Sequence, residues 1–380
     1  MVAGLALPAA LFLAPALWRL GRVVAVLRGR ARLPRASDAL ASRGSAVVSV
    51  LVPARNEERN VGACLASLSA QACPSLEIIA VDDGSTDGTP AILADAARRD
   101  PRVRILRVDG PPPGWTGKSF ALDAGVSVAR GSWLCFTDAD TVHAPESIAR
   151  AVGFAETHGL ALLSLTSRQL ARSFWERVVQ PVVFGLLDQW FPLATVNDPA
   201  SPLAAANGIF ILVARDAYQD AGGHRAVAGE ILEDVALARR VKAGGGRIAF
   251  VDGADLVAAR MYTDLAAIRR GWTKNLYRLR GRRPLAALAS LLELGVTLVW
   301  PAVGCVVAPL GGPAGSGWLA ALGLGLVLGA EIPFRAWRGD DPRWSPTAPL
   351  GAALVALFLL ESAVRDWLGL GVRWKDRRYT

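Results

Sequence analysis

Hydrophobic residues are distributed unevenly along this chain of 380 residues, and this distribution limits the possible folds more than any other feature. Residues 284–334 contain only two charged side chains, Glu293 and Glu331, and residues 2–18 contain none. Residues 44–283 between them have an ordinary density of charge. A helix needs about 17 to 25 mostly apolar residues to cross a bilayer. The pattern therefore predicts one water-exposed domain between two membrane-embedded blocks.

The N-terminal apolar run is followed, not preceded, by basic residues. A cleavable signal peptide has its basic residues before the apolar run, and basic segments beside a span tend to stay in the cytoplasm. We therefore expect residues 1–43 to form a membrane anchor and a basic linker, with the next domain in the cytoplasm. Because Pro8 and Pro15 weaken a spanning helix, an anchor that lies in the membrane interface is the alternative.

The C-terminal region contains three apolar runs. A Gly/Pro/Ser cluster at 311–317 separates two segments that can each span a bilayer, and a third run covers about 347–363. We expect membrane helices over 284–364 and a basic tail at 365–380. Three crossings would place that tail outside, against the tendency of basic residues to stay inside. One segment is thus expected to be re-entrant or interfacial, and the sequence does not say which. We therefore expect a multi-pass protein of the cell (inner) membrane.

Composition narrows the class of protein. The formal net charge of +9 suggests a nucleic-acid, phosphate or anionic-membrane partner. The mean hydropathy of +0.32 is above that of ordinary soluble domains, so part of the chain is expected in lipid. Because the basic residues flank apolar segments, we favour the membrane and expect no nucleic-acid partner. The four cysteines have no metal-site spacing and argue against a disulfide scaffold. The three histidines also lack metal-site spacing, and we expect them on the surface or in loops.

The middle region alternates between short β-branched runs and helical segments. We expect strands at 46–52, 76–81, 103–108, 132–137, 208–213 and 247–251, and helices at about 57–70, 87–99, 117–130, 145–157 and 232–243. The alternation predicts an α/β domain with a mainly parallel sheet and helices on both faces. Ligands bind at the carboxyl ends of strands in such sheets, so functional residues should lie in the loops that begin there.

Carboxylates follow two of these strands. Asp82 and Asp83 follow the second strand, and Asp138 and Asp140 follow the fourth. A carboxylate at the end of a buried strand is costly unless it binds something. Two carboxylates at i and i+2 suit Mg²⁺ or Mn²⁺, with substrate phosphates completing the coordination. For Asp87 a helix-capping role is as good an explanation as a ligand-binding one.

Three further segments carry candidate residues. Lys118 follows a P-loop-like run that has Pro112 where glycine is required, so we keep Lys118 only as a phosphate contact at a helix start. Glu233 and Asp234 open a helix, where the helix dipole alone favours carboxylates and a general base is the functional alternative. The basic segment 269–283 can meet anionic lipid headgroups or hold a diphosphate.

Four motifs occur in the order found in family 2 glycosyltransferases: VPARNEE at 52–58, VDDGSTDGT at 81–89, TDAD at 137–140 and LEDVALARRVKAGG at 232–245. The chain resembles this family over about residues 45–280. Three other segments, 111–125, 173–181 and 196–208, together with the terminal membrane segments, are similar to the hopene-associated glycosyltransferase group. Carotenoid glycosyltransferases of bacteria share this general layout.

The resemblance implies a GT-A (Rossmann-like) domain that uses a nucleotide sugar, often UDP-linked, and inverts the anomeric centre. It assigns the nucleotide-sugar pocket to Pro53, Arg55, Glu57, Asp82, Asp83, Asp138 and Asn207, and we place Lys118 in the same pocket as the phosphate contact. It assigns the catalytic base to Asp234 with Glu233 beside it, and the metal to Asp140 and Asp138. In the basic segment, Arg269, Arg270 and Lys274 are the candidates for phosphate contacts. Processive members carry Q-x-x-R-W, which residues 268–272 lack, so a single sugar transfer is expected.

The expected activity is transfer of one sugar to a lipid hydroxyl, of a hopanoid or a carotenoid-type polyisoprenoid. A polyprenyl-phosphate or glycerolipid acceptor is a second interpretation. A catalytically silent membrane scaffold that binds nucleotide sugars is a third, and the retained carboxylates argue against it.

Overall fold

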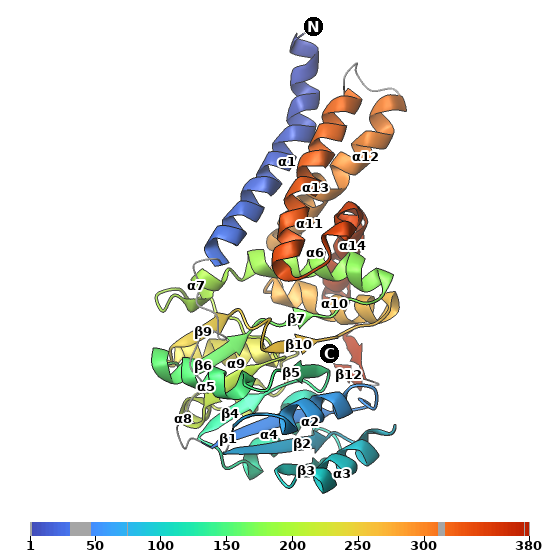
Figure 1. Cartoon of the computed structure of the whole chain (residues 1–380). Helices are drawn as coiled ribbons and strands as arrows, with labels where there is room; N and C mark the ends of the chain where they lie inside the picture. The colour runs from blue at the N-terminus through green and yellow to red at the C-terminus, as the bar shows by residue number, and fades with distance from the viewer. Residues whose placement is uncertain (1, 31–46, 74, 311–315, 376, 380) are drawn as a thin grey trace. The chain divides into compact units, whose positions relative to one another are not determined.

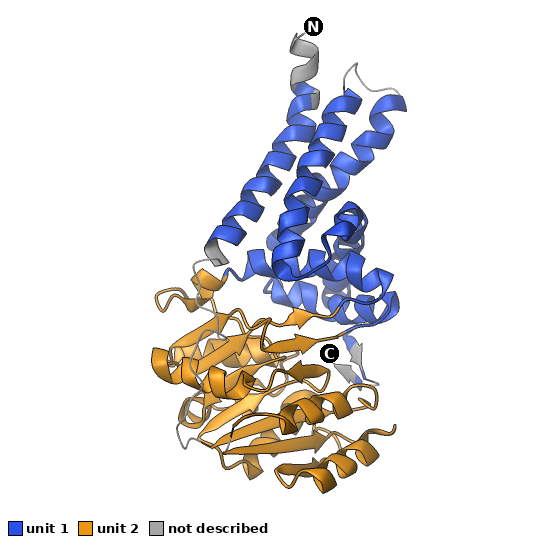
Figure 2. Cartoon of the chain, in the orientation of Figure 1, with its two compact units in different colours: residues 1–32, 171–192, 262–380 blue, residues 33–170, 193–261 orange. Residues whose placement is uncertain are grey.

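The computed structural model describes residues 2–30, 47–73, 75–310, 316–375 and 377–379. The chain forms two compact units (Figure 2): a helical unit of residues 1–32, 171–192 and 262–380, and an α/β unit of residues 33–170 and 193–261. The linker arginines Arg32, Arg35 and Arg43 and the glycine-rich segment 311–315 lie outside the described residues. The domain boundaries expected at residues 43, 283 and 364 follow sequence order and stay a prediction.

The α/β unit contains a seven-stranded sheet in the order β3-β2-β1-β4-β8-β6-β9 (Figure 1). Its strands are β1 (Val48–Ala54), β2 (Leu76–Asp82), β3 (Val103–Arg107), β4 (Trp133–Phe136), β6 (Leu162–Leu165), β8 (Ile211–Ala214) and β9 (Ile248–Val251). β3, β2, β1 and β4 are parallel to one another, β8 is antiparallel to both β4 and β6, and β6 is parallel to β9. A smaller sheet contains β5 (Thr141–His143), β10 (Val257–Ala259) and β7 (Arg168–Gln169).

Helices cover both faces of the large sheet. They are α2 (Val61–Ser69), α3 (Thr89–Arg99), α4 (Gly117–Val128), α5 (Ser147–His158), α7 (Leu193–Asn197), α8 (Arg215–Asp220) and α9 (Glu233–Ala243). Successive side chains of β2 point to opposite faces: Ile78 packs with Leu65 of α2, whereas Ile79 packs with Ala121 of α4. The expectation of an α/β fold with a mainly parallel sheet is confirmed.

Most of the expected elements are present with small shifts at their ends. All six predicted strands and all five predicted helices of the middle region have a counterpart. The sequence did not predict the interior strand β6, the small sheet, the short helices α7 and α8, or the longer helices α6 (Phe174–Trp190) and α10 (Leu265–Leu279). α6 begins with a capping box, in which Ser173 accepts from the backbone N–H of Glu176 and the Glu176 carboxylate accepts from that of Ser173.

The helical unit contains α1 (Val2–Arg30), α6, α10, α11 (Pro284–Leu294), α12 (Trp300–Val307), α13 (Ser316–Arg338) and α14 (Ala348–Trp367). A π-helical segment, η3 (Gly295–Val299), joins α11 to α12, and the 3₁₀ turns η4 (Ala308–Leu310) and η5 (Pro342–Thr347) follow α12 and precede α14. A short hairpin, β11 (Val372–Trp374) and β12 (Arg377–Tyr379), ends the chain. Four described helical segments are long and apolar enough to cross a membrane, at 9–28, 284–310, 316–338 and 342–367.

Contacts between α1 and α13 combine close packing with a buried ion pair. A Cβ added to Gly323 of α13 would lie 2.6 Å from the carbonyl oxygen of Phe12, so glycine allows the two backbones to approach. Nearer the other end of the contact, Arg19 Nη2 lies 2.6 Å from Glu331 Oε1, and both side chains are almost completely buried. Arg19, which was expected to follow the membrane anchor, thus lies within α1 and is paired with Glu331.

Candidate functional site

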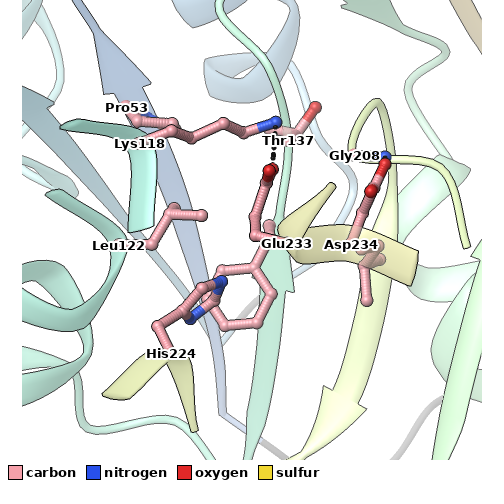
Figure 3. A pocket seen from close by; sticks show the side chains of 10 residues that line it. Pro53, Lys118, Leu122, Thr137, Gly208, His224, Glu233 and Asp234 are labelled. Atoms are coloured by element: carbon pink, nitrogen blue, oxygen red, sulfur yellow. Dashed lines mark hydrogen bonds and ion pairs between the residues drawn. The ribbon is translucent and has the colours of Figure 1, made fainter. Parts of the chain in front are cut away.

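A pocket of about 240 Å³ opens in the α/β unit at the carboxyl ends of β1 and β4 and at the first turns of α4 and α9. Its lining consists of Pro53, Lys118, Leu122, Phe136, Thr137, Gly208, Ile211, His224, Glu233 and Asp234 (Figure 3).

Lys118 lies between two carboxylates. It occupies the first turn of α4, which begins after Thr116, whose hydroxyl accepts from the backbone N–H of Ser119. Lys118 Nζ is 2.6 Å from Asp138 Oδ1 and 2.8 Å from Glu233 Oε1. Burial opposes its charge, but the two carboxylates outweigh burial and hold the pKa of Lys118 well above its usual range. The lysine is thus a fixed positive charge that brings β4 and α9 together.

Asp234 lies beside this ion pair at the start of α9. Its Oδ2 accepts from the backbone N–H of Gly208 at 2.9 Å, and its Oδ1 accepts from the backbone N–H of Val235 at 2.8 Å. Burial, followed by the charge of Glu233, raises the pKa of Asp234 to about 6. A carboxylate with a pKa near neutrality is suited to accept a proton during a reaction.

Gly208 leaves room for these charged groups to meet. A Cβ at this position would lie 2.6 Å from Lys118 Nζ and 3.5 Å from both Asp138 Oδ2 and Asp234 Oδ2. The neighbouring Asn207 does not line the pocket, and its side-chain oxygen accepts from the backbone N–H of Ile209 at 3.2 Å. Asn207 therefore shapes the turn that presents Gly208.

The other residues expected around the nucleotide form a loop network next to Pro53. Arg55 Nη1 donates to the carbonyl oxygen of Asp83 at 2.6 Å, and Asp82 Oδ1 accepts from the backbone N–H of Ser85 at 2.9 Å. Asp82 and Asp83 are both buried. Glu57 Oε2 accepts from the side chain of Asn60. None of these four charged residues lines the pocket, so a role in nucleotide binding stays a prediction.

The hydrogen bonds of Asp87 support the helix-capping explanation for this residue. Asp87 Oδ1 accepts from the backbone N–H of Thr89, the first residue of α3, and Oδ2 accepts from that of Glu58. These bonds help to keep the pKa of Asp87 low against the opposing effect of burial. The side chain therefore ties the helix start to the loop after β1.

Asp138 and Asp140 provide the hard oxygen ligands that a divalent cation prefers, at the end of β4. Within the described residues, no group of three or more His, Cys, Asp or Glu side chains is arranged to hold a metal. The two carboxylates therefore fit Mg²⁺ or Mn²⁺ only if the phosphates of a donor supply further ligands, which is usual for Mg²⁺. To bind the metal, the Asp138 carboxylate would have to give up its ion pair with Lys118 or contact both the lysine and the metal.

The three residues expected to contact phosphate belong to the helical unit. Arg269, Arg270 and Lys274 belong to α10 in the helical unit, not to the unit that contains the pocket. Arg269 is bonded to Glu361 of α14 at 2.8 Å. Their assignment to a diphosphate stays a prediction.

The expected position of the histidines is wrong for two of the three. His143 and His224 are buried, and burial lowers the pKa of His143 to about 4. His224 lines the pocket, where its Nδ1 lies 2.9 Å from the hydroxyl of Tyr218 and its ring packs edge-on against Phe136. Burial, then the charge of Lys118, lowers the pKa of His224 to about 3. No sequence spacing marked His224, because the aromatic ring that it packs against, Phe136, comes from a strand distant in sequence.

Comparison with known proteins gives this geometry a context. Residues 49–212 match the model of the family described as glycosyl transferase family 2. Two 4,4'-diaponeurosporenoate glycosyltransferases of Staphylococcus aureus, from strains USA300 and MRSA252, are 29% and 28% identical over 233 residues. Each match covers 60% of this chain and 60% of the relative's length.

A solved structure shows the same fold. A mannosyltransferase from Pyrobaculum calidifontis, in complex with GDP-Man and Mn²⁺, superposes with a TM-score of 0.60 at 20% identity. The match covers 95% of this chain and 99% of the mannosyltransferase. The protein therefore contains a family 2 glycosyltransferase domain with the GT-A fold.

Proposed function

We propose that this protein is a membrane-bound inverting glycosyltransferase that moves one sugar from a nucleotide sugar, UDP-linked, to the hydroxyl group of a lipid. The observation that carries the proposal is the position of Asp234. A half-buried carboxylate with a raised pKa accepts a hydrogen bond from the backbone N–H of Gly208, next to Lys118 and Asp138.

The reaction needs a base and a stabilised leaving group. The acceptor oxygen attacks the anomeric carbon while the bond from that carbon to the diphosphate breaks, and Asp234 takes the hydroxyl proton. Lys118 offers positive charge to the diphosphate that departs. A divalent cation held by Asp138 and Asp140 would neutralise further phosphate charge when bound.

The acceptor proposal is a polyisoprenoid-type lipid such as a hopanoid or a carotenoid. Four helical segments long enough to span a membrane belong to the same chain as the pocket, so a lipid is a natural substrate. The S. aureus relatives are named for a carotenoid-type acid. We further propose a multi-pass protein of the inner membrane with the pocket in the cytoplasm, where nucleotide sugars are made, because Arg19, Arg22 and Arg28 follow the apolar part of α1.

An assay of membranes that contain the protein tests the proposal. The membranes receive a labelled sugar as UDP-glucose, UDP-N-acetylglucosamine or GDP-mannose, with hopanoid, carotenoid, polyprenyl phosphate or glycerolipid as acceptor. We expect label in the organic phase from a UDP-linked donor and a polyisoprenoid alcohol. Transfer only to polyprenyl phosphate or glycerolipid would reject the acceptor, and nucleotide binding without transfer to any lipid would favour the silent scaffold.

The metal assignment has its own test. Substitution Asp140→Asn removes one of two carboxylate ligands, so UDP binding should lose most of its enhancement by Mn²⁺ or Mg²⁺. Isothermal titration with and without metal measures this change, and Asp216→Asn, an exposed aspartate on α8, serves as the control. UDP binding by the unaltered protein that is indifferent to both metals would contradict the role of Asp140.

A further inference from the structure

The C-terminal helix α14 is long and apolar enough to cross a membrane, but its contacts indicate a different position. We propose that α14 lies in the cytoplasmic interface of the bilayer beside α6 and α10, and that only α1, the segment 284–310 and α13 cross. The partner of the outer face of α14 is then the boundary between lipid headgroups and acyl chains. The inference concerns topology and rests only on the proposed cytoplasmic side of the α/β unit.

The last turns of α14 are tied to α10. Trp367 Nε1 donates to the hydroxyl of Tyr277 at 2.9 Å, and Ser362 Oγ accepts from the backbone N–H of Tyr277 at 3.1 Å. Asp366 pairs with Arg278 at 3.2 Å. The end of α14 and the end of α10 must therefore lie at the same depth.

That depth is outside the hydrocarbon core. α10 carries Arg269, Arg270, Lys274 and Arg278 within its 15 residues, and such a charge density is costly inside a bilayer. α10 also directly precedes α11, the first helix of the segment 284–310, so that segment starts at the depth of the end of α10. The last turns of α14 are thus on the cytoplasmic side.

The first turns of α14 are on the same side. α13 returns from the far face and ends at Arg338, whose side chain pairs with Asp188 of α6. η5 follows within a few residues, and its Trp344 contacts the start of α6, with the Arg177 guanidinium 5.2 Å from the indole ring. A Cβ added to Gly351 would collide with the carbonyl oxygen of Val178, so α14 begins in direct contact with α6.

Both ends of α14 therefore lie at one face of the membrane, which a crossing helix does not allow. Its 20 residues extend about 30 Å, close to the thickness of the hydrocarbon core. α14 packs against α6, α10, α11 and η3, and its extensive contacts within the described chain do not include α1, α12 or α13. Figure 1 shows α1, α12 and α13 extending well beyond α14.

The outer face of α14 suits a lipid interface. A single exposed stripe consists of Leu350, Leu357, Leu360, Val364 and Trp367, at 44, 59, 47, 38 and 59% exposure. The opposite face is buried within the helical unit. Tryptophan and arginine are typical of the membrane boundary, and Trp367 and Arg365 occupy the last turn. With two crossings after the α/β unit instead of three, the basic tail 365–380 returns to the cytoplasm, as the positive-inside tendency requires.

Epitope accessibility in the full chain tests the topology. One variant carries a short epitope after Thr380, a second carries it between Gly312 and Pro313, and a third carries it after Gly339. In intact bacterial spheroplasts we expect antibody labelling only of the second variant, with the first and third labelled only after permeabilisation. Labelling of the C-terminal epitope in intact cells would overturn the proposal, because α14 would then cross. Failure of the 312/313 epitope to label in intact cells would also overturn it, since the segments before and after that site would not cross.

The outcome is distinguishable from that of the glycosyl-transfer assay. Membranes of each epitope variant can be tested for lipid glycosylation separately. An external C-terminus in an active enzyme would reject the topology alone, whereas a cytoplasmic C-terminus in a protein without transfer would reject the activity alone.

Discussion

Lys118, Glu233 and Asp234 form a coupled group in which each charge sets the protonation of its neighbours. Glu233 raises the pKa of Asp234, and Lys118 lowers it. Because Asp234 must be deprotonated to accept a proton, activity should fall as the pH drops through about 6. The acidic limb of the pH profile is the range of low pH in which activity falls. Its position therefore depends on the charges of Glu233 and Lys118.

Substitutions of the two neighbours should move the limb in opposite directions. Glu233→Gln removes a charge that raises the pKa of Asp234, so the limb should shift to lower pH. Lys118→Met removes a charge that lowers this pKa, so the limb should shift to higher pH, with weaker donor binding as well. Profiles of kcat/KM against pH measure both shifts; equal profiles for the two variants and the unaltered enzyme would exclude Asp234 as the titrating base.

The residue types of this site could be predicted, but not all of their partners. Asp138, Glu233 and Asp234 stand in short motifs at strand and helix ends, so their position could be read from the sequence. Lys118 was expected to contact phosphate, and the structure shows it paired with carboxylates. His224 reaches the pocket through contacts with Phe136 and Tyr218, which are far from one another in sequence and form only when the sheet assembles.

At the scale of elements, the approach of α1 to α13 depends on glycine. Substitution Gly323→Ala places a Cβ 2.6 Å from a backbone oxygen of Phe12, so the helices must separate. We expect a lower melting temperature of the detergent-solubilised protein. Gly325→Ala, on the same helix with nothing within 4 Å, is the matched control and should leave it unchanged or slightly higher. Equal melting temperatures for both variants would contradict the packing of α1 on α13.

The ion pair between α1 and α13 gives a second prediction at this scale. Glu331→Gln leaves the guanidinium of Arg19 buried without its counter-charge, and breaking a buried pair from one side costs about 3–5 kcal/mol. The double variant Arg19→Met, Glu331→Gln should recover a large part of the lost stability, because no unpaired charge remains. Thermal unfolding of the three variants measures the coupling, and additive losses in the double variant would show that the pair is not coupled.

Sequence periodicity predicted elements where the pattern was strong and missed those defined by their neighbours. The β-branched runs that form β1 and β2 are buried on both faces, so both strands could be recognised directly from the sequence. β6 is paired with β8 and β9 and has only four residues, so its existence depends on strands that are distant in sequence. α6 and α10 mix charged and apolar residues, and neither resembles a membrane span or a helix of the sheet.

At the scale of the whole molecule, the apolar ends could be assigned to membrane helices. Composition alone could not decide whether the C-terminal region crosses the membrane two or three times. The apolar run that became α14 is as hydrophobic as a true span. Only its hydrogen bonds to α10 and its contact with α6 distinguish an interfacial helix from a crossing one. The division into two compact units likewise depends on contacts, since the helical unit draws on three separate stretches of the chain.

The central claim is that Asp234 removes the proton of the acceptor hydroxyl, and substitution Asp234→Asn tests it most directly. Amide in place of carboxylate keeps the shape of the site and removes the base, whose contribution is about 10²- to 10⁴-fold. Transfer of labelled sugar to lipid should therefore fall at least a hundredfold while the Kd for UDP stays within a factor of about three, with Asp216→Asn as the unaffected control. Undiminished turnover of the Asp234→Asn enzyme would contradict the account.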